Sequence, residues 1–324
     1  MIGMFLFIFQ HREDSRNKKD DKMGNHDCVP CNFILNIFTA IVLVVVFVVL
    51  EVYPIVPAFH RGFYCNDDTI NKPYLEKETI STSTLIVTSV LLVIILATIC
   101  ELTKRCRKTA PTQPQNVVLI RRKFPAWICR LLSRISLIII GLLMTLIVVD
   151  IGKKLIGRLR PHFLTVCQPD TNLYNCTDGY ITADVCTNPD IAVVAEARLS
   201  FPSGHAAMSA FVAVVLALYI EYTVKVGSLF KPLVQYMLLC VGLAGALSRI
   251  PDYYHHWSDV LVGLFIGVAH ALYTVFYLLK LQDEKKVDNK VESTTTTNMN
   301  TANPAPQGVV KSATNCENGN GDVV

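Results

Sequence analysis

Six long apolar runs constrain this 324-residue chain more than any other feature. About 20 helical residues cross the hydrocarbon core of a bilayer, and runs of that kind occupy residues 33–53, 84–102, 131–151, 206–222, 232–249 and 258–280. Charge is nearly absent within them, although Arg134 and His270 interrupt the edges of the third and sixth. A soluble six-helix core is the alternative, but a chain that is 52% hydrophobic and 17% charged is too apolar for an ordinary soluble protein. The sequence therefore predicts an all-α, polytopic integral membrane protein with six transmembrane helices.

The distribution of Lys and Arg predicts how these spans are oriented. Short cytosolic loops carry an excess of basic residues. Such residues are dense before the first span and between the second and third, whereas the first-to-second connection has only Arg61, Lys72 and Lys77. Both termini should therefore be cytosolic. The cations at 153–160 and Arg198 break the pattern, because they lie in a connection that is predicted to be external. We attribute this exception to a bound anion.

Composition divides the chain into three parts. Residues 1–31 are expected to form a cytosolic tail, 32–282 the six-helix membrane domain, and 283–324 a disordered cytosolic tail, since that last stretch is polar and rich in Thr and Asn. Its final residues, Asp322 to Val324, could add as a strand to a partner domain that captures C-termini. An ordinary tail end is the simpler interpretation.

The predicted external loops contain signs of an oxidising compartment. Asn175 begins an N-glycosylation sequon, Asn-Cys-Thr, in the connection between the third and fourth spans. Four cysteines, Cys65, Cys167, Cys176 and Cys186, also lie in these loops. We expect one or two disulfides among them, although spacing alone does not determine the pairing.

Three polar clusters lie at the ends of apolar runs, where such residues are costly unless they are functional. The first is KKLIGRLRP, in which Lys153 and Arg160 are seven residues apart. On one continuing helix both would project from the same face and could hold one phosphate, with Pro161 ending the helix. Flanking charges that snorkel to the interface are the alternative. Lys154 and Arg158, on other faces, are expected to do that.

The second cluster, Pro202-Ser203-Gly204-His205, directly precedes the fourth span. Serine is a favoured N-cap residue, and glycine lets the backbone approach a ligand closely. The free N–H groups and dipole of a helix start also attract anions. Simple capping would explain Ser203, but it does not explain an imidazole at the mouth of an apolar span.

The third cluster is SRIPDYYHHWSD, from Ser248 to Asp259. His255 and Asp259 are four residues apart and would share a helical face. The carboxylate could then accept a hydrogen bond from one ring nitrogen and leave the lone pair of the other free for attack. His256 would point elsewhere, in a packing or interfacial role. A single His–Asp pair is usually structural, but Arg249 and the other two clusters favour a functional one.

Together, K-x6-RP, PSGH and SR-x5-H-x3-D resemble the complete signature of the type 2 phosphatidic acid phosphatase superfamily. Within it, IGRLRPHFL and HHWSDV resemble the animal lipid phosphate phosphatases. The resemblance implies a phosphatase that needs no metal or other cofactor. It implies that the phosphoryl oxygens are held by Lys153, Arg160, Ser203, Gly204 and Arg249. It further implies that His255, oriented by Asp259, attacks phosphorus, while His205 protonates the leaving alkoxide and then activates water.

The resemblance also implies a substrate and a location. The active site would lie at the extracellular or lumenal interface, and no nucleic-acid partner is expected. The partners would be the lipid bilayer and a lipid phosphomonoester, namely phosphatidate, lysophosphatidate, sphingosine 1-phosphate or ceramide 1-phosphate. The plasma membrane is the expected location, with an endomembrane as the alternative, and a homo-oligomer remains open. Alternatives are a superfamily phosphatase for a soluble sugar phosphate or a polyprenyl pyrophosphate, and a non-catalytic membrane scaffold. A channel or transporter is disfavoured, because the polar residues gather at span ends.

Overall fold

The computed structural model describes residues 28–52, 57–107, 116–119, 122–170, 172–174, 176, 179–225 and 229–283. Most of the predicted N-terminal tail and nearly all of the C-terminal tail lie outside the described residues, as does Asn175 of the sequon. The predicted domain boundaries and the glycosylation therefore stay predictions.

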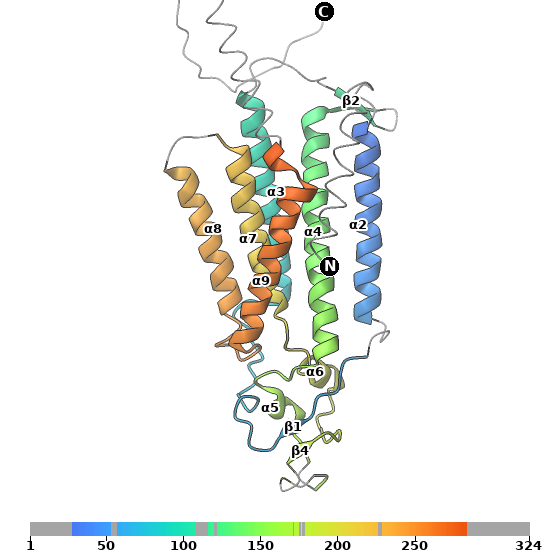
Figure 1. The fold of residues 1–324 in the computed structure, drawn as a ribbon, viewed down its shortest axis with the longest axis vertical. Coiled ribbons are helices and arrows are strands. Elements are labelled where there is room, and N and C mark those ends of the chain that lie inside the picture. Colours follow the sequence, from blue (N-terminus) through green and yellow to red (C-terminus); the bar gives the residue numbers. More distant parts are fainter. Residues whose placement is uncertain are drawn as a thin grey trace, which may run out of the picture.

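Six long helices run side by side within the described part of the chain (Figure 1). They are α2 (Cys28–Val52), α3 (Thr82–Arg107), α4 (Ala126–Ile156), α7 (Gly204–Thr223), α8 (Phe230–Leu247) and α9 (Trp257–Tyr273), with α9 continued by the π-helix η2 (Thr274–Leu278). Each overlaps one predicted span, and the predicted fold class is confirmed. Five of them, α3, α4, α7, α8 and α9 with η2, are long and apolar enough to cross a membrane. Helix α2 has a shorter described apolar stretch, Ile34–Leu50, which is consistent with the sixth span.

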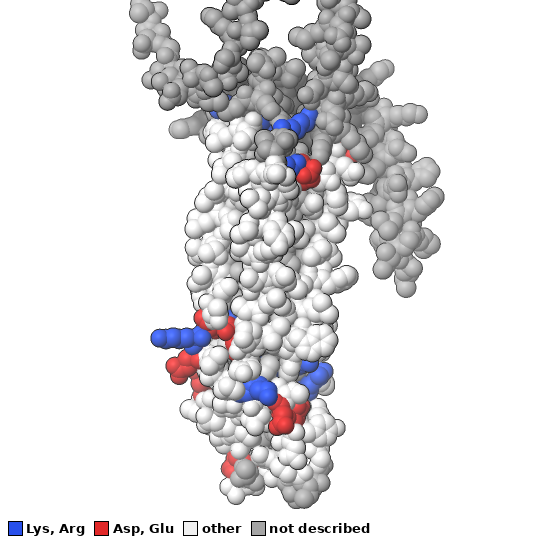
Figure 2. Space-filling view, turned by 90° about the vertical axis from the view of Figure 1, so that its left-hand side faces the viewer, with Lys and Arg blue, Asp and Glu red and all other residues white. Residues whose placement is uncertain are grey.

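The outer surface of the bundle is apolar along most of its length. Leu91, Ile95, Leu243 and Phe265 are each about half exposed or more. Figure 2 shows an uncharged middle band, with Lys, Arg, Asp and Glu gathered toward the two ends. A surface of this kind is stable in contact with lipid, and it would be unfavourable in water. The protein is a multi-pass integral membrane protein.

Helix α7 is the centre of the bundle and packs against α3, α4, α8 and α9. Its contact with α9 depends on small residues, which let two helix backbones approach closely. A Cβ atom on Gly263 would lie 2.5 Å from the carbonyl oxygen of Ser203, and one on Gly267 would lie 2.2 Å from that of Ala207. The Ser203 N–H also donates to the Asp259 carbonyl, at 3.1 Å. The close packing therefore holds the N-terminal ends of α7 and α9 together.

The arginine that interrupts the third predicted span is buried with partners. Arg134 of α4 forms an ion pair with Glu101 of α3. The hydroxyl of Tyr219, on α7, donates to the same carboxylate at 2.9 Å. Ionisable residues at such depth are costly unless they are paired. This cluster therefore allows a charge near the edge of a span while it links three helices.

The connections at one end of the bundle fold into a small domain-like cap, seen in the lower part of Figure 1. This loop cap comprises residues 57–81 and 157–203. It contains the short helices α5 (Phe163–Cys167) and α6 (Ile191–Glu196), and strand β1 (Phe63–Tyr64) pairs antiparallel with β4 (Tyr180–Ile181). At the opposite end, β2 (Asn116–Leu119) pairs with β3 (Arg122–Pro125).

Two disulfides cross-link the loop cap. They join Cys65 to Cys176 and Cys167 to Cys186. The prediction of one or two disulfides is confirmed, and the structure supplies the pairing that the sequence left open. Because Cys65 and Cys176 are 111 residues apart in the chain, their bond ties the connection after α2 to the connection after α4.

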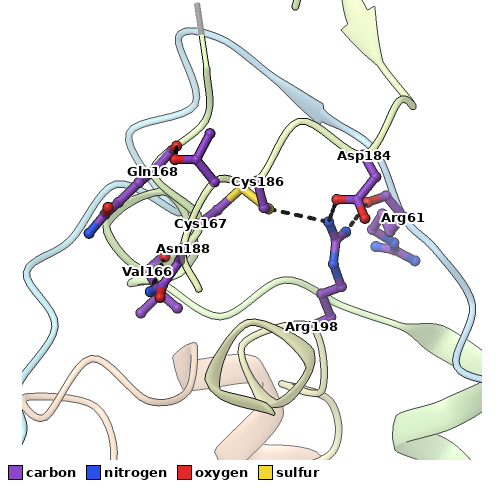
Figure 3. The surroundings of a disulfide bond; sticks show 9 residues. Arg61, Val166, Cys167, Gln168, Asp184, Cys186, Asn188 and Arg198 are labelled. Carbon is purple, nitrogen blue, oxygen red and sulfur yellow. Dashed lines mark hydrogen bonds and ion pairs between the residues drawn. A yellow bond between two sulfur atoms is a disulfide. The ribbon is translucent and has the colours of Figure 1, made fainter. Parts of the chain in front are cut away.

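Arg198 belongs to the loop cap, and the prediction that it serves a bound anion is wrong. Its guanidinium lies 3.6 Å from the Asp184 carboxylate and donates to the Arg61 carbonyl at 3.3 Å (Figure 3). Its Cζ atom also lies 4.8 Å from the centre of the Phe163 ring, within cation–π distance. The positive charge of Arg198 therefore stabilises the loop cap.

Candidate active site

A cavity of about 610 Å³ lies where the loop cap meets the bundle. Most of the predicted site residues line it, although they come from distant parts of the chain: Lys153, Arg160, Gly204, His205, Arg249 and His255. The two others, Ser203 and Asp259, are fully buried at the starts of α7 and α9. The structure thus brings the three polar clusters of the sequence to one place.

Lys153 and Arg160 reach the cavity from different elements. Lys153 lies in the last turn of α4, which ends at Ile156 because Gly157 adopts a left-handed conformation with φ 54°. A side chain is excluded there, since a Cβ atom on Gly157 would lie 1.9 Å from the Phe59 carbonyl oxygen. Arg160 therefore lies in the loop beyond α4. The prediction of a shared helical face ended by Pro161 is wrong, and loop geometry makes the two cations converge.

Two buried guanidinium groups form a cationic wall of the cavity. Arg160 forms an ion pair with Glu196 of α6. Arg249, in the turn after α8, is 1% exposed and donates to Glu78 at 3.0 Å. The ring centre of Tyr254 lies 5.3 Å from Cζ of Arg160 and 4.5 Å from Cζ of Arg249. Both distances allow a cation–π interaction, so one aromatic ring supports both cations.

Three polar nitrogens at the cavity have no hydrogen-bond partner among the described residues. They are Nε of Arg160, Nε of Arg249 and Nε2 of His205, and all three are buried. A buried polar group without a partner costs about 1–3 kcal/mol, and a charged one costs more. Oxygens of an anion would satisfy the two guanidinium donors. The cavity therefore has the chemistry of an oxyanion-binding site.

The start of α7 adds a second kind of anion attraction. Ser203 is the N-cap, and its Oγ accepts from the Ala206 N–H at 3.4 Å, as predicted. Gly204 and His205 follow in the first turn and line the cavity. The N–H groups of a first helical turn lack intrahelical acceptors, and the helix dipole favours negative charge beside them.

His255 is held in one tautomer by a backbone carbonyl. Its Nδ1 lies 2.7 Å from the Ser200 carbonyl oxygen. Because a carbonyl only accepts, Nδ1 must carry the proton, and the lone pair of Nε2 is left available at the cavity. Burial, together with the nearby charges of Arg160, Lys153 and Arg249, lowers the pKa of His255 well below its ordinary value. The imidazole is therefore neutral at physiological pH, as a nucleophile requires.

Asp259 does not orient His255 directly, and that prediction is wrong. Its Oδ2 lies 3.9 Å from His255 Nδ1, too far for a hydrogen bond. The Ser200 carbonyl accepts the hydrogen bond from the ring N–H instead. The same residue's hydroxyl donates to Asp259 Oδ2 at 2.6 Å. The Asp259 carboxylate therefore acts on the imidazole in two ways. Its negative charge lies nearby, and it holds the Ser200 hydroxyl, while the carbonyl of the same serine holds the ring.

The prediction that Lys154 and Arg158 are ordinary flanking charges that snorkel is wrong, because both pair with carboxylates. Lys154 is buried, lies 3.2 Å from the Asp150 carboxylate and donates to the Leu50 carbonyl of α2. Arg158 forms an ion pair with Asp259 and so compensates its buried charge. In each case a nearby carboxylate offers the cation a partner inside the protein.

His256 has a structural role at the start of α9. It is the N-cap of α9, and its ring accepts a hydrogen bond from the Asp259 backbone N–H. Its Nε2 then carries the proton and donates to the Leu159 carbonyl at 3.1 Å. His256 lines a separate cavity of about 460 Å³.

Several site residues have no signal in the sequence. Glu78 and Glu196 lie in connections without a periodic pattern, and Ser200 acts largely through its backbone carbonyl. Tyr254 and His162 also line the cavity, and their rings pack edge to face with centroids 4.9 Å apart. Burial is the main cause that lowers the pKa of His162 to about 4. Within the described ranges, no group of three or more His, Cys, Asp or Glu residues could hold a metal ion.

Comparison with known proteins identifies relatives of this chain. Residues 134–283, which include all the predicted site residues from Lys153 to Asp259, match the model of the PAP2 superfamily. The chain is 35% identical over 244 residues to phospholipid phosphatase 1 of Rattus norvegicus, a match that covers 74% of this chain and 83% of the relative. It is 36% identical over 223 residues to phospholipid phosphatase 2 of Homo sapiens, covering 68% and 74%. No solved structure is significantly similar to this chain.

Proposed function

This chain belongs to the PAP2 superfamily, in its phospholipid phosphatase branch, and we propose that it is a metal-independent lipid phosphate phosphatase. The observation that carries the proposal is the cavity itself. The free Nε2 of His255 and the side chain of His205 line the same cavity as Lys153, Arg160 and Arg249. One nucleophile, one proton carrier and three cations are what phosphate-ester hydrolysis through a covalent intermediate requires.

The first step transfers the phosphoryl group to the protein. Nε2 of His255 attacks phosphorus, and the P–O bond to the lipid alkoxide breaks as the new P–N bond forms. Protonated His205 gives its proton to the leaving oxygen, which departs as an alcohol. The Ser200 carbonyl and the charge of Asp259 stabilise the positive charge that develops on the attacking imidazole.

The second step releases phosphate. Neutral His205 accepts a proton from a water molecule as the water oxygen bonds to phosphorus. The P–N bond breaks, and His255 and protonated His205 are restored. Throughout, Lys153, Arg160 and Arg249 offset the charge on the equatorial oxygens, with help from Ser203 and the backbone at Gly204. Positioning and fixed charge of this kind supply most of the rate in phosphoryl transfer.

The cavity also has a lining suited to a lipid. Its walls include Phe47 of α2, Leu85 and Ile86 of α3, Leu146 of α4 and Met208 of α7. These apolar side chains continue from the cationic end of the cavity into the bundle. A phosphomonoester headgroup would lie at the cations, with the adjoining part of its lipid against the apolar wall. The substrate class is therefore phosphatidate, lysophosphatidate, sphingosine 1-phosphate and ceramide 1-phosphate.

We further propose that both termini face the cytosol and that the loop cap lies on the extracellular or lumenal side. The Lys and Arg distribution and the two disulfides of the cap support this orientation. The plasma membrane is the proposed location, while a homo-oligomer and a C-terminal peptide-binding partner stay predictions.

Asn175→Gln tests the orientation. If the loop cap is external, endoglycosidase treatment of the protein from cells should increase its electrophoretic mobility, because a glycan is removed from Asn175. The variant should migrate like the treated protein and should not respond to the enzyme. The proposal would be contradicted if the wild-type protein carried no glycan in cells that do glycosylate a control protein. The loop cap would then not be an external segment that is glycosylated at Asn175.

His255→Gln tests the nucleophile. Purified wild-type protein in mixed micelles with EDTA should release phosphate from phosphatidate, and the variant should lower kcat by at least about 10³-fold. A radiolabelled substrate should leave an acid-labile phosphoenzyme on the wild type alone. His60→Gln, an exposed substitution in the loop cap, is the matched control. Normal turnover by His255→Gln, or loss of wild-type activity in EDTA, would contradict the proposed chemistry.

Lys153→Gln tests the electrostatic control of His255. Removing one positive neighbour should raise the pKa of His255 from its lowered value, so the acid limb of kcat/KM should move to higher pH, by about one pH unit. The ionisation of the substrate itself cancels when both proteins are assayed with the same lipid. Lys77→Gln, exposed in the loop cap, should leave the limb where it is. A limb that stays fixed in Lys153→Gln would show that another group controls it.

A further inference from the structure

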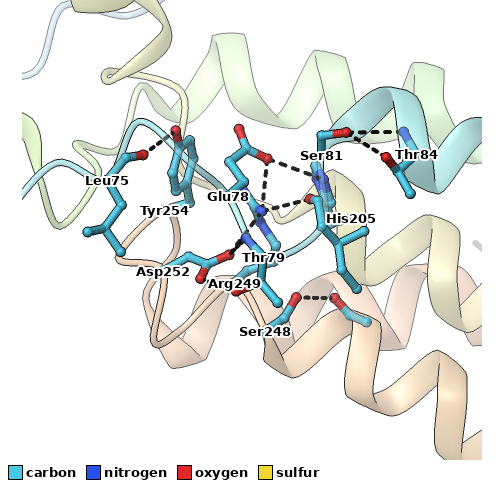
Figure 4. Close-up of polar contacts among 12 residues, drawn as sticks. Leu75, Glu78, Thr79, Ser81, Thr84, His205, Ser248, Arg249, Asp252 and Tyr254 are labelled. Carbon is cyan, nitrogen blue, oxygen red and sulfur yellow. Dashed lines mark hydrogen bonds and ion pairs between the residues drawn. The ribbon is translucent and has the colours of Figure 1, made fainter.

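Glu78 lies between two proposed members of the active site, although it comes from the connection between α2 and α3. Its Oε2 accepts from Arg249 Nη1 at 3.0 Å and lies 4.0 Å from His205 Nε2 (Figure 4). The carboxylate lines the cavity, and its side chain is 22% exposed. It also lies outside residues 134–283, the part of the chain that the PAP2 superfamily model matches.

The segment that carries Glu78 is anchored firmly against the turn after α8. The N–H and hydroxyl of Thr79 donate to the two carboxylate oxygens of Asp252, at 3.0 and 2.6 Å. The carbonyl of Ile80 accepts from Arg249 at 3.2 Å. These bonds join consecutive residues of one loop to the turn that holds Arg249. The two residues directly after Glu78 are therefore fixed, unlike residues beside a charged side chain at the end of a free loop.

His205 requires such a neighbour for its proposed role. Its Nε2 is buried and has no hydrogen-bond partner in the described part of the chain. Three cations, Lys153, Arg160 and Arg249, line the same cavity as His205, and their positive charge opposes a proton on its imidazole. The Glu78 carboxylate, at 4.0 Å, is too far away for a hydrogen bond, but its negative charge opposes that effect and favours a proton on His205.

We infer that Glu78 is a positioning residue that favours the protonated form of His205 through its negative charge while it holds Arg249 in place beside the phosphoryl group. The inference rests on the proposed phosphatase function and deepens it. In the transfer step, His205 gives its proton to the alkoxide as the P–O bond breaks, and Glu78 compensates the imidazolium charge before that transfer. Glu78 itself neither gains nor loses a proton.

A second carboxylate at the cavity provides a comparison. Glu196 pairs with Arg160, whereas Glu78 pairs with Arg249, and the Glu196 side chain is 53% exposed. Replacing either glutamate by glutamine removes one negative charge near the phosphoryl site. Only the change at Glu78 removes the carboxylate beside the proposed general acid.

The test compares substrates whose leaving groups differ in their need for a proton. Lysophosphatidate leaves as an alkoxide that must be protonated, whereas 4-nitrophenyl phosphate leaves as a stable phenolate. General acid catalysis contributes typically 10²–10⁴-fold when the leaving group needs a proton. Glu78→Gln should therefore lower kcat/KM for lysophosphatidate at least about 10-fold more than for 4-nitrophenyl phosphate. Glu78→Asp should restore part of the loss.

Reference variants make the outcome decisive. His205→Gln should show the same substrate dependence in a stronger form, and Glu196→Gln should change both substrates by similar factors. Glu76→Gln, exposed two residues away, should behave as wild type. Equal losses on both substrates in Glu78→Gln, or no loss, would overturn the inference while the proposed function stands. Failure of the wild type to hydrolyse either substrate would instead overturn the proposed function.

Discussion

The concentration of positive charge at the end of an apolar bundle is the constraint on which the rest of this structure depends. Arg160 and Arg249 are almost fully buried, and Lys153 lines the same cavity. Removing such cations from water is costly unless they are paired and hydrogen-bonded. Glu78 and Glu196 supply part of the compensation, and the ring of Tyr254 supports both guanidinium groups. The remaining buried Nε donors are what a phosphoryl group would satisfy.

This arrangement needs a rigid frame, because the groups arrive from separate elements. Close packing of glycines on α9 against α7 holds two helix starts together. One of these helix starts carries Ser203 and His205, and the other carries Asp259 directly after the turn that bears His255. The disulfide-linked loop cap then places Arg160 and Glu78 at the active-site cavity. Catalytic geometry of this kind is lost with small displacements, so the cap is part of the catalytic unit.

Much of this could be predicted from the sequence, and the reasons differ between features. Span positions follow from the length of apolar runs, since lipid imposes that length on any helix. The site residues were recognisable because Lys153, Arg160 and His255 are costly at span ends without a function. The sequence could not reveal that Gly157 ends α4 before Arg160, because only the approach of Phe59 makes a helix impossible there. Nor could it show that a backbone carbonyl, at Ser200, would replace Asp259 at the imidazole.

The carboxylate partners of the buried cations, which are distant in the sequence, could not be predicted either. Nothing local distinguishes Glu78 from the exposed Glu76, and only the folded loop brings Glu78 to Arg249. Lys154 and Arg158 were expected at the interface because their buried carboxylate partners belong to the tertiary structure. A carboxylate that neutralises a buried cation leaves no pattern in the chain, whereas a long apolar helix does.

The most direct test of the central claim is an experimental structure of the protein with vanadate, which mimics a phosphoryl group in transfer. The account predicts vanadium bonded to Nε2 of His255, with His205 on the opposite side and oxygens within hydrogen-bond distance of Nε of Arg160 and Nε of Arg249. Vanadate bound away from these cations, or flanked by only one of the two imidazoles, would contradict it.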